Sequence, residues 1–249
     1  MKEKYKYLLV CEGPTDITFL KHLINKLGAD LGKSVEVVEL APQRDATTGT
    51  WPAHGWTEVR SWCKSWKIKT QDDLSKIQNH FIELAKRRNW KALVATSGAD
   101  GLIIQMDTDI AEQISDLPIK FTESDEERRN YCQSAIYFWI GESDEVADKP
   151  FLLLPSFSME TWLLATHAPE VNVFDDLAKP FNYEEIIDLE QRLVSIGYSY
   201  KTKKGIKKLA KKESEYIGYA DRVHANFIDV ATRCKEANHL QSFLIEKLI

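Results

Sequence analysis

Three acidic residues directly follow two short apolar segments of this chain. Glu12 comes after residues 7–11, and Asp107 and Asp109 come after residues 102–106. Continuous apolar runs of this length are typical of strands that are buried on both faces of a parallel sheet. Ligands of open α/β sheets bind beyond the carboxyl ends of such strands, and residues i and i+2 of an extended chain face the same side. If the two strands are neighbours, the three carboxylates converge.

Converging carboxylates repel one another unless a cation lies between them. Two unit charges ~4 Å apart repel by ~4 kcal/mol at an effective dielectric constant of ~20. Oxygen ligands without His or Cys favour Mg²⁺ or Mn²⁺ over zinc, and carboxylates with such a metal indicate phosphoryl chemistry. Glu12 taken alone is more commonly a solvated loop residue, and a DxD pattern also occurs by chance. The combination of motifs predicts a site for Mg²⁺ or Mn²⁺ built from Glu12, Asp107 and Asp109.

The surrounding sequence predicts the elements that position these acids. Pro14 suits the first position of a helix and Asp16 its first turn, and apolar residues at helical spacing follow. Further strands are expected over residues 35–40, 102–106 and 151–154. Helices are expected over residues 57–66 and 123–140 and from residues 72 and 158 onward. Residues 41–55 are expected to form a loop, and residues 92–97 fit either a helix end or a short strand.

Alternating strands and helices predict an α/β fold with a mainly parallel sheet flanked by helices. We expect this domain over residues 1–170, with a helical insertion around residues 41–98. Residues 171–249 are expected to form a helical C-terminal region, because from about residue 180 the pattern is mostly helical. The clearest helical pattern there is one apolar stripe from Tyr216 to Cys234.

Two segments carry a resemblance to a known family. LLVCEGPTDITFL and LIIQMDTDI resemble the two signature segments of TOPRIM domains, which occur in topoisomerases, DnaG-type primases and nucleases of the overcoming-lysogenization-defect family. The resemblance implies a Rossmann-like TOPRIM fold over roughly residues 5–155. It also implies that Glu12 acts as general acid/base and that Asp107 and Asp109 bind Mg²⁺. Asp16 matches the second acidic position of these nucleases.

A third segment, FLLLPSFSMETWLLA, resembles small stand-alone TOPRIM proteins of the RloB-like group associated with bacterial defence. This resemblance implies that Glu160 joins the site and supports a second metal ion. The alternative is that Glu160 is only an acid in the first turn of a helix, where the helix dipole favours it. The segment between the two signature motifs is longer than in compact TOPRIM domains, which leaves the strand order open.

A lysine-rich segment lies in the C-terminal region of this otherwise acidic chain. Its lysines are Lys201, Lys203, Lys204, Lys207, Lys208, Lys211 and Lys212. We expect Lys203, Lys204, Lys207 and Lys208 to contact a nucleic-acid backbone. One lysine of the segment could instead stabilise a transition state, as the family resemblance implies. The alternative is a solvated helix face.

Aromatic and histidine residues give weaker signals. Trp51, Trp56, Trp62 and Trp66 could stack on bases or bind a partner, but such residues more often belong to the core. The six histidines show no ligand spacing, and His54 and His167 are only weak candidates for the site.

Composition limits the class of protein. A net charge of −5 excludes a surface coated in positive charge but allows a local basic patch. The four cysteines are widely spaced, which argues against zinc and predicts reduced thiols in a cytoplasmic protein. No segment approaches the ~20 apolar residues that cross a membrane. The P-loop pattern GxxxxGK[ST] is absent, so we do not expect this chain to be a P-loop ATPase.

These features predict a Mg²⁺-dependent nuclease that hydrolyses phosphodiester bonds in DNA or RNA. By resemblance, it would be the effector of an anti-phage defence system acting with a separate ATPase of the ABC or AAA type. One alternative is a non-catalytic subunit that keeps the fold and binds an ATPase or nucleic acid.

Another alternative is a phosphatase of the haloacid-dehalogenase type with Asp107 as nucleophile and Asp109 as acid/base. That family has Thr or Val where this chain has Ala111, and it gives Glu12 no role. Homo-oligomer formation is left open.

Overall fold

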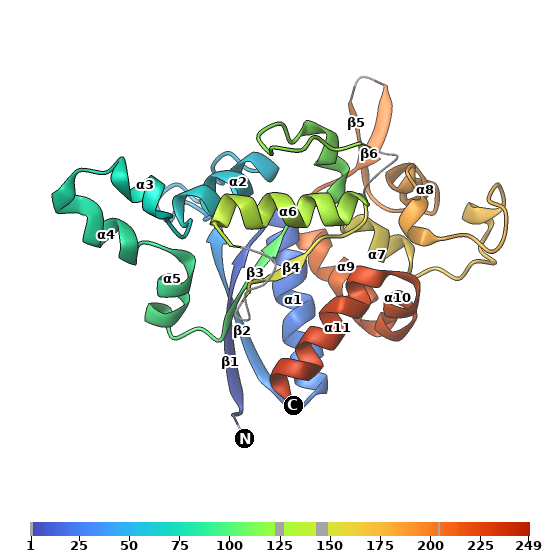
Figure 1. Cartoon of the computed structure of the whole chain (residues 1–249). Coiled ribbons are helices and arrows are strands. Elements are labelled where there is room, and N and C mark those ends of the chain that lie inside the picture. The colour runs from blue at the N-terminus through green and yellow to red at the C-terminus, as the bar shows by residue number, and fades with distance from the viewer. Residues whose placement is uncertain (1, 123–126, 143–148, 204) are drawn as a thin grey trace.

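A four-stranded parallel sheet lies at the centre of the protein (Figure 1). The computed structural model describes residues 2–122, 127–142, 149–203 and 205–249. The strand order is β2-β1-β3-β4. The strands are β1 (Lys4–Val10), β2 (Ser34–Ala41), β3 (Gly101–Gln105) and β4 (Phe151–Leu153). The predicted α/β class with a parallel sheet flanked by helices is confirmed.

Both faces of the sheet are buried, which explains the continuous apolar runs in its strands. Leu8 and Val10 of β1 face one core, whereas Leu9 faces the other. Because successive side chains of a strand point to opposite faces, each strand contributes to both cores. The first core contains α1 (Pro14–Asp30) and the C-terminal helices. The second core contains α2 (Trp56–Ser65) and α6 (Arg128–Ile140).

The register of the sheet aligns the carboxyl ends of three strands. Val10 of β1 pairs with Ile104 of β3, and Ile104 pairs with Leu152 of β4. Beyond β3, the backbone N–H of Met106 still donates to the carbonyl of Leu153 at 3.2 Å. Residues that immediately follow β1, β3 and β4 therefore lie close together at the carboxyl-terminal end of the sheet.

The predicted insertion between β2 and β3 is helical. It contains α2, α3 (Gln71–Ser75), α4 (Ile82–Arg87) and α5 (Trp90–Ser97). The ambiguous residues 92–97 belong to α5, whose first turn is capped by the Asn89 side chain at 3.0 Å from the N–H of Ala92. Gly98 ends this helix with a φ of 65°, a left-handed conformation that glycine adopts without strain. Trp56, Trp62 and Trp66 pack against the second core, as expected.

The C-terminal region differs from the expected helical layer in one element. Residues of the lysine-rich segment form an antiparallel hairpin of β5 (Tyr200–Lys203) and β6 (Ile206–Leu209). The expectation of a helix there was wrong. Gly205 adopts a φ of 77°, which hairpin turns require and which a helix interior does not use. A glycine inside a helix would also cost ~1 kcal/mol relative to alanine.

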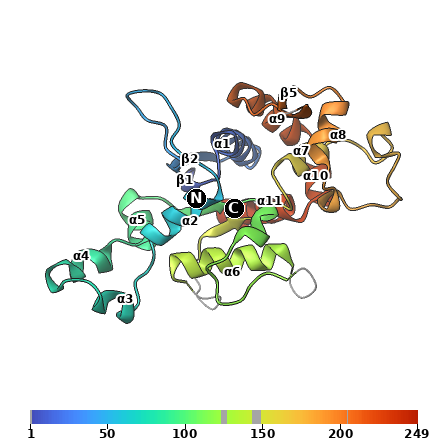
Figure 2. The same cartoon turned by 90° about the horizontal axis from the view of Figure 1, so that it is seen from above.

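The remaining C-terminal elements are helical. They are α7 (Glu160–Leu164), α8 (Leu189–Ser195), α9 (Glu213–Ala225), α10 (Phe227–Arg233) and α11 (Lys235–Leu248). Short 3₁₀ turns at Asn172–Phe174 and Tyr183–Glu185 lie between α7 and α8, and another at Asn79–Phe81 lies in the insertion between α3 and α4. The apolar stripe from Tyr216 to Cys234 is not one helix as predicted, because it is divided between α9 and α10 at Asn226. In both views α3 and α4 lie on the opposite side of the molecule from α8 and α10 (Figure 2).

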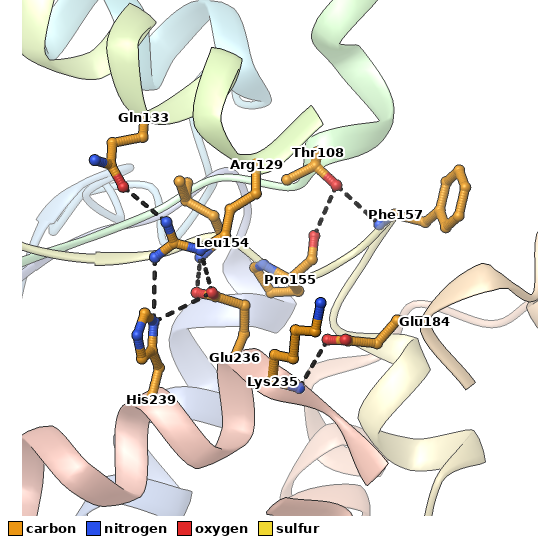
Figure 3. A network of polar contacts seen from close by, with 10 residues as sticks. All are labelled: Thr108, Arg129, Gln133, Leu154, Pro155, Phe157, Glu184, Lys235, Glu236 and His239. Atoms are coloured by element: carbon orange, nitrogen blue, oxygen red, sulfur yellow. Dashed lines mark hydrogen bonds and ion pairs between the residues drawn. The ribbon is translucent and has the colours of Figure 1, made fainter. Parts of the chain in front are cut away.

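A buried acid fastens α11 to the sheet and to α6. Glu236 is 2% exposed, and its carboxylate accepts the N–H of Leu154, just beyond β4, at 2.9 Å. It also pairs with Arg129 of α6, which donates to Gln133 at 2.7 Å (Figure 3).

Among the described residues, no helix is long and apolar enough to cross a bilayer.

Candidate functional site

Glu12 and Asp107 lie side by side because β1 and β3 are neighbours in the sheet. One carboxylate oxygen of Glu12 accepts the backbone N–H of Asp107 at 2.8 Å. Gln105, the last residue of β3, bridges the same pair, because its amide oxygen accepts the N–H of Glu12 at 3.2 Å and its Nε2 donates to Asp107 at 2.8 Å. Gln105 is fully buried and was not singled out from the sequence. The only sequence signal for it is a polar residue inside an apolar strand.

Asp16 reaches the same place from the first turn of α1. Its side chain is only 7% exposed. Gly13, the residue before this helix, allows that approach, because an added Cβ would lie 3.2 Å from a carboxylate oxygen of Asp16. Gly55 donates its N–H to the carbonyl of Glu12 at 2.6 Å, which fixes the end of the loop after β2 against the site.

Asp109 does not extend β3 as the DxD interpretation assumed. The strand ends at Gln105, and Thr108–Gln113 form a 3₁₀ turn whose first turn contains Asp109. Thr108 ties this turn to the chain beyond β4, since its hydroxyl donates to the carbonyl of Pro155 at 3.1 Å and accepts the N–H of Phe157 at 3.0 Å (Figure 3). The expectation that Asp107 and Asp109 share one side of an extended chain was therefore wrong. Asp109 is the most exposed of the five candidate acids.

Glu160 enters the site from the start of α7, just beyond β4. Its side chain is 3% exposed and accepts a hydrogen bond from the Tyr216 hydroxyl at 2.6 Å. The ammonium group of Lys211 lies 3.3 Å from the same carboxylate. Tyr216 belongs to α9 and was expected only as part of an apolar stripe, and Lys211 was one lysine among seven. Neither role could be predicted without the tertiary structure.

The electrostatics of this acidic group are dominated by burial. Burial raises the pKa of Glu12 to about 8 and that of Asp16 to about 7, and nearby acids contribute in the same direction. The pKa of Asp107 is raised well above its ordinary value for the same reasons, and burial also raises the pKa of Asp109. Glu160 differs. Burial alone would raise its pKa, but Lys211 and the Tyr216 hydroxyl hold that pKa below its usual value.

Three of these acids open into one cavity of about 430 Å³. Glu12, Asp16 and Asp107 line it together with Trp51, His54, Lys211 and Lys212. Trp51 packs against the first core and donates its indole N–H to Glu213 at 2.9 Å. His54 thus lies at the site, whereas His167 contacts Tyr198 at 3.2 Å and is not among the residues that line this cavity.

The donor chemistry of the site fits a hard divalent cation. The candidate ligands are all carboxylates, and their raised pKa values mean that the surroundings compensate their negative charge poorly. The arrangement in this state is not a finished cage. Within the described parts of the chain, no three His, Cys, Asp or Glu side chains are grouped so that they could hold a metal ion.

Three of the four predicted basic residues lie on the hairpin that leads to this cavity. Lys207 and Lys208 of β6 are exposed, and the Lys207 ammonium lies 4.5 Å from the centre of the Tyr200 ring. Lys203 belongs to β5, and Lys204 lies outside the described residues. Lys211 and Lys212 lie beyond Ala210, the residue after β6, and line the cavity. The chain thus carries positive charge from an exposed hairpin to an acidic site.

No family model, curated protein or solved structure matches this chain.

Proposed function

We propose that this protein is a metal-dependent nuclease of TOPRIM type that hydrolyses phosphodiester bonds in DNA or RNA. The observation that carries the proposal is the cavity that Glu12, Asp16 and Asp107 line beside the carboxyl ends of parallel strands. Buried carboxylates with poorly compensated charge are costly for a fold, and they persist where a function uses them. Binding of phosphate and a divalent cation is the use that best fits an all-oxygen group beside lysines.

The roles of the acids follow from their positions. Glu12, Asp16, Asp107, Asp109 and Glu160 would hold one or two Mg²⁺ or Mn²⁺ ions. When bound, the metal would neutralise phosphate charge and lower the pKa of a water molecule. The N–H of Asp107 orients Glu12. By the family resemblance, Glu12 would also exchange a proton with the attacking water.

The hairpin supplies the contact with the substrate in this proposal. Lys203, Lys204, Lys207 and Lys208 would bind backbone phosphates, and Lys211 and Lys212 would continue this contact into the cavity. Such contacts give affinity without sequence preference. They support nucleic acid as the substrate without distinguishing DNA from RNA.

The biological setting of the proposal rests on family resemblance alone. The chain would act in the cytoplasm as an effector of anti-phage defence, together with an ABC-type or AAA-type ATPase. The absence of a P-loop pattern in its sequence agrees with a separate source of ATP hydrolysis.

A non-catalytic subunit that binds an ATPase or nucleic acid is the second candidate. Two observations favour it: the described residues form no ready cage for a metal ion, and Lys211 already pairs with Glu160. The haloacid-dehalogenase alternative is less favoured, because Asp109 lies on a separate turn and Glu12 would have no role.

Cleavage assays distinguish these candidates. Wild type, Glu12→Gln and Asp107→Asn are incubated with supercoiled plasmid, single-stranded DNA and bulk tRNA, each in Mg²⁺, in Mn²⁺ and in chelator. Metal-dependent cleavage that both substitutions abolish supports the nuclease and identifies its substrate. Cleavage that survives both substitutions contradicts the site. A stable complex with nucleic acid but no cleavage in either metal would favour the non-catalytic subunit.

A further inference from the structure

Lys211 is a cation inside the acidic site. Its ammonium group lies 3.3 Å from Glu160, and it interacts electrostatically with all five candidate acids. Glu160 is the largest cause of a raised pKa of Lys211, and Asp16 and Asp107 act in the same direction, so this side chain remains charged. Lys211 thus supplies positive charge where the proposed function requires a metal.

We propose that Lys211 is an internal counter-ion that competes with the divalent cation for these carboxylates and thereby sets the affinity of the site for metal. This inference rests on the proposed function, because it concerns the metal of that same site. A divalent cation bound among these acids would repel an ammonium group at this distance. Lys211 must therefore leave Glu160 before the site is fully loaded.

The surroundings of the pair allow that exchange without unfolding. The Lys211 side chain retains 45% of its exposure, whereas Glu160 retains 3%. The lysine can therefore swing into solvent while Glu160 stays fixed by the Tyr216 hydroxyl at 2.6 Å. The backbone beside Lys211 is anchored, since Leu209 is buried and the N–H of Ala210 donates to the carbonyl of Ser199 at 2.8 Å. Only the flexible side chain has to move.

As a consequence, Lys211 rather than a metal ion neutralises the acids of the site when the metal concentration is low. Without metal, Lys211 offsets part of the repulsion between the buried acids and stabilises the fold. With metal, the displaced ammonium group remains tethered at the wall of the cavity, since Lys211 lines it. The same residue would therefore affect metal-free stability and metal affinity in opposite directions.

The test is a calorimetric titration of Mn²⁺ into wild type, Lys211→Met, Lys211→Arg and Lys86→Met, each also melted in chelator. Lys86→Met is the matched control, because Lys86 is an exposed lysine on α4 and has no part in the site. We expect Lys211→Met to bind Mn²⁺ at least about tenfold more tightly than wild type and to melt at a lower temperature in chelator. Lys211→Arg and Lys86→Met should behave like wild type.

Equal or weaker Mn²⁺ binding by Lys211→Met would overturn the inference, because it would show that Lys211 does not compete. If Lys211→Met does not fold, tighter binding by Lys211→Gln supports the inference and unchanged binding overturns it. The proposed nuclease function is tested by a different result: it fails if wild type binds Mn²⁺ at this site but cleaves no nucleic acid. In that case the Mn²⁺ titrations would still show whether Lys211 lowers the affinity of the site for metal.

Discussion

At the scale of single residues, the site depends on a side chain that performs no chemistry. Gln105 is fully buried at the end of β3 and bonds to the backbone of Glu12 and to the carboxylate of Asp107. Both acids are thereby held at fixed positions on neighbouring strands. Glu12 and Asp107 could be predicted because they directly follow apolar strands. The role of Gln105 could not be predicted, because nothing in the sequence indicates which groups its amide bonds to.

Replacing Gln105 with leucine tests whether this residue orients Glu12 and Asp107 for metal binding as well as stabilising the fold. Gln105→Leu keeps the volume but leaves the N–H of Glu12 without its partner, so we expect a loss of about 1–3 kcal/mol in the free energy of unfolding. Mn²⁺ affinity should fall, because the two acids lose their orientation. Calorimetric titration and urea unfolding measure both effects. Gln133→Leu, which alters a glutamine bonded to Arg129 on α6, is the control and should bind Mn²⁺ like wild type.

A second residue-scale prediction concerns pH. Burial, with a contribution from the charge of Arg222, lowers the pKa of His167 to about 4. Between pH 6.5 and 4 the unfolded chain therefore takes up a proton that the folded protein does not, so His167 destabilises the fold as the pH falls through this window. Melting curves of wild type and His167→Gln should diverge toward low pH, with wild type losing more stability. Parallel curves from pH 7 to 4.5 would show that His167 does not titrate as described.

At the scale of elements, the buried strands could be predicted from the sequence, whereas the β5–β6 hairpin could not. The strands around residues 7–11 and 102–106 were predictable because strands buried on both faces are apolar throughout. The β5–β6 hairpin was missed because lysines at mixed spacing suit either a helix or an exposed strand. Gly205, with its positive φ, was the one signal for a turn. The break at Asn226 between α9 and α10 had no signal in the apolar stripe.

The hairpin prediction can be tested by charge reversal. We expect the double substitution Lys207→Glu and Lys208→Glu to weaken nucleic-acid binding and to reduce the slope of log K against log salt by about 2, one for each lost phosphate contact. Fluorescence anisotropy over a salt series, in chelator, measures this slope. Lys86→Glu is the control, because this exposed lysine belongs to α4, which lies far from β5 in both views, and the change should leave the slope unchanged. An unchanged slope for the double variant would exclude the hairpin as the binding element.

At the scale of the whole molecule, the C-terminal region is joined to the sheet at the site itself. It supplies Lys211 and Tyr216 to the acidic group, and its helices share the first core with β1 and α1. Glu236 adds a buried polar link from α11 to Leu154 and Arg129 (Figure 3). The sequence placed this region after the α/β domain, but contacts between residues so far apart in the chain leave no local pattern.

Removing that link should destabilise the whole fold. Glu236→Ala leaves the N–H of Leu154 without a partner and removes the carboxylate that Arg129 pairs with, so we expect a loss of about 3 kcal/mol in the free energy of unfolding. Glu246→Ala on the same helix is the control. Its carboxylate is 71% exposed, and the change should be near zero. Equal stability of the two variants in urea unfolding would show that Glu236 is not a structural link.

The most direct test of the account is an anomalous diffraction measurement on crystals soaked in Mn²⁺. We predict an anomalous peak in the cavity beside Glu12 and Asp107, with at least one of these carboxylates bonded to the ion, and no peak there in Asp107→Asn crystals. Wild-type crystals that show no Mn²⁺ at these acids, at a concentration that saturates binding in solution, would contradict the proposed metal site and the nuclease that depends on it.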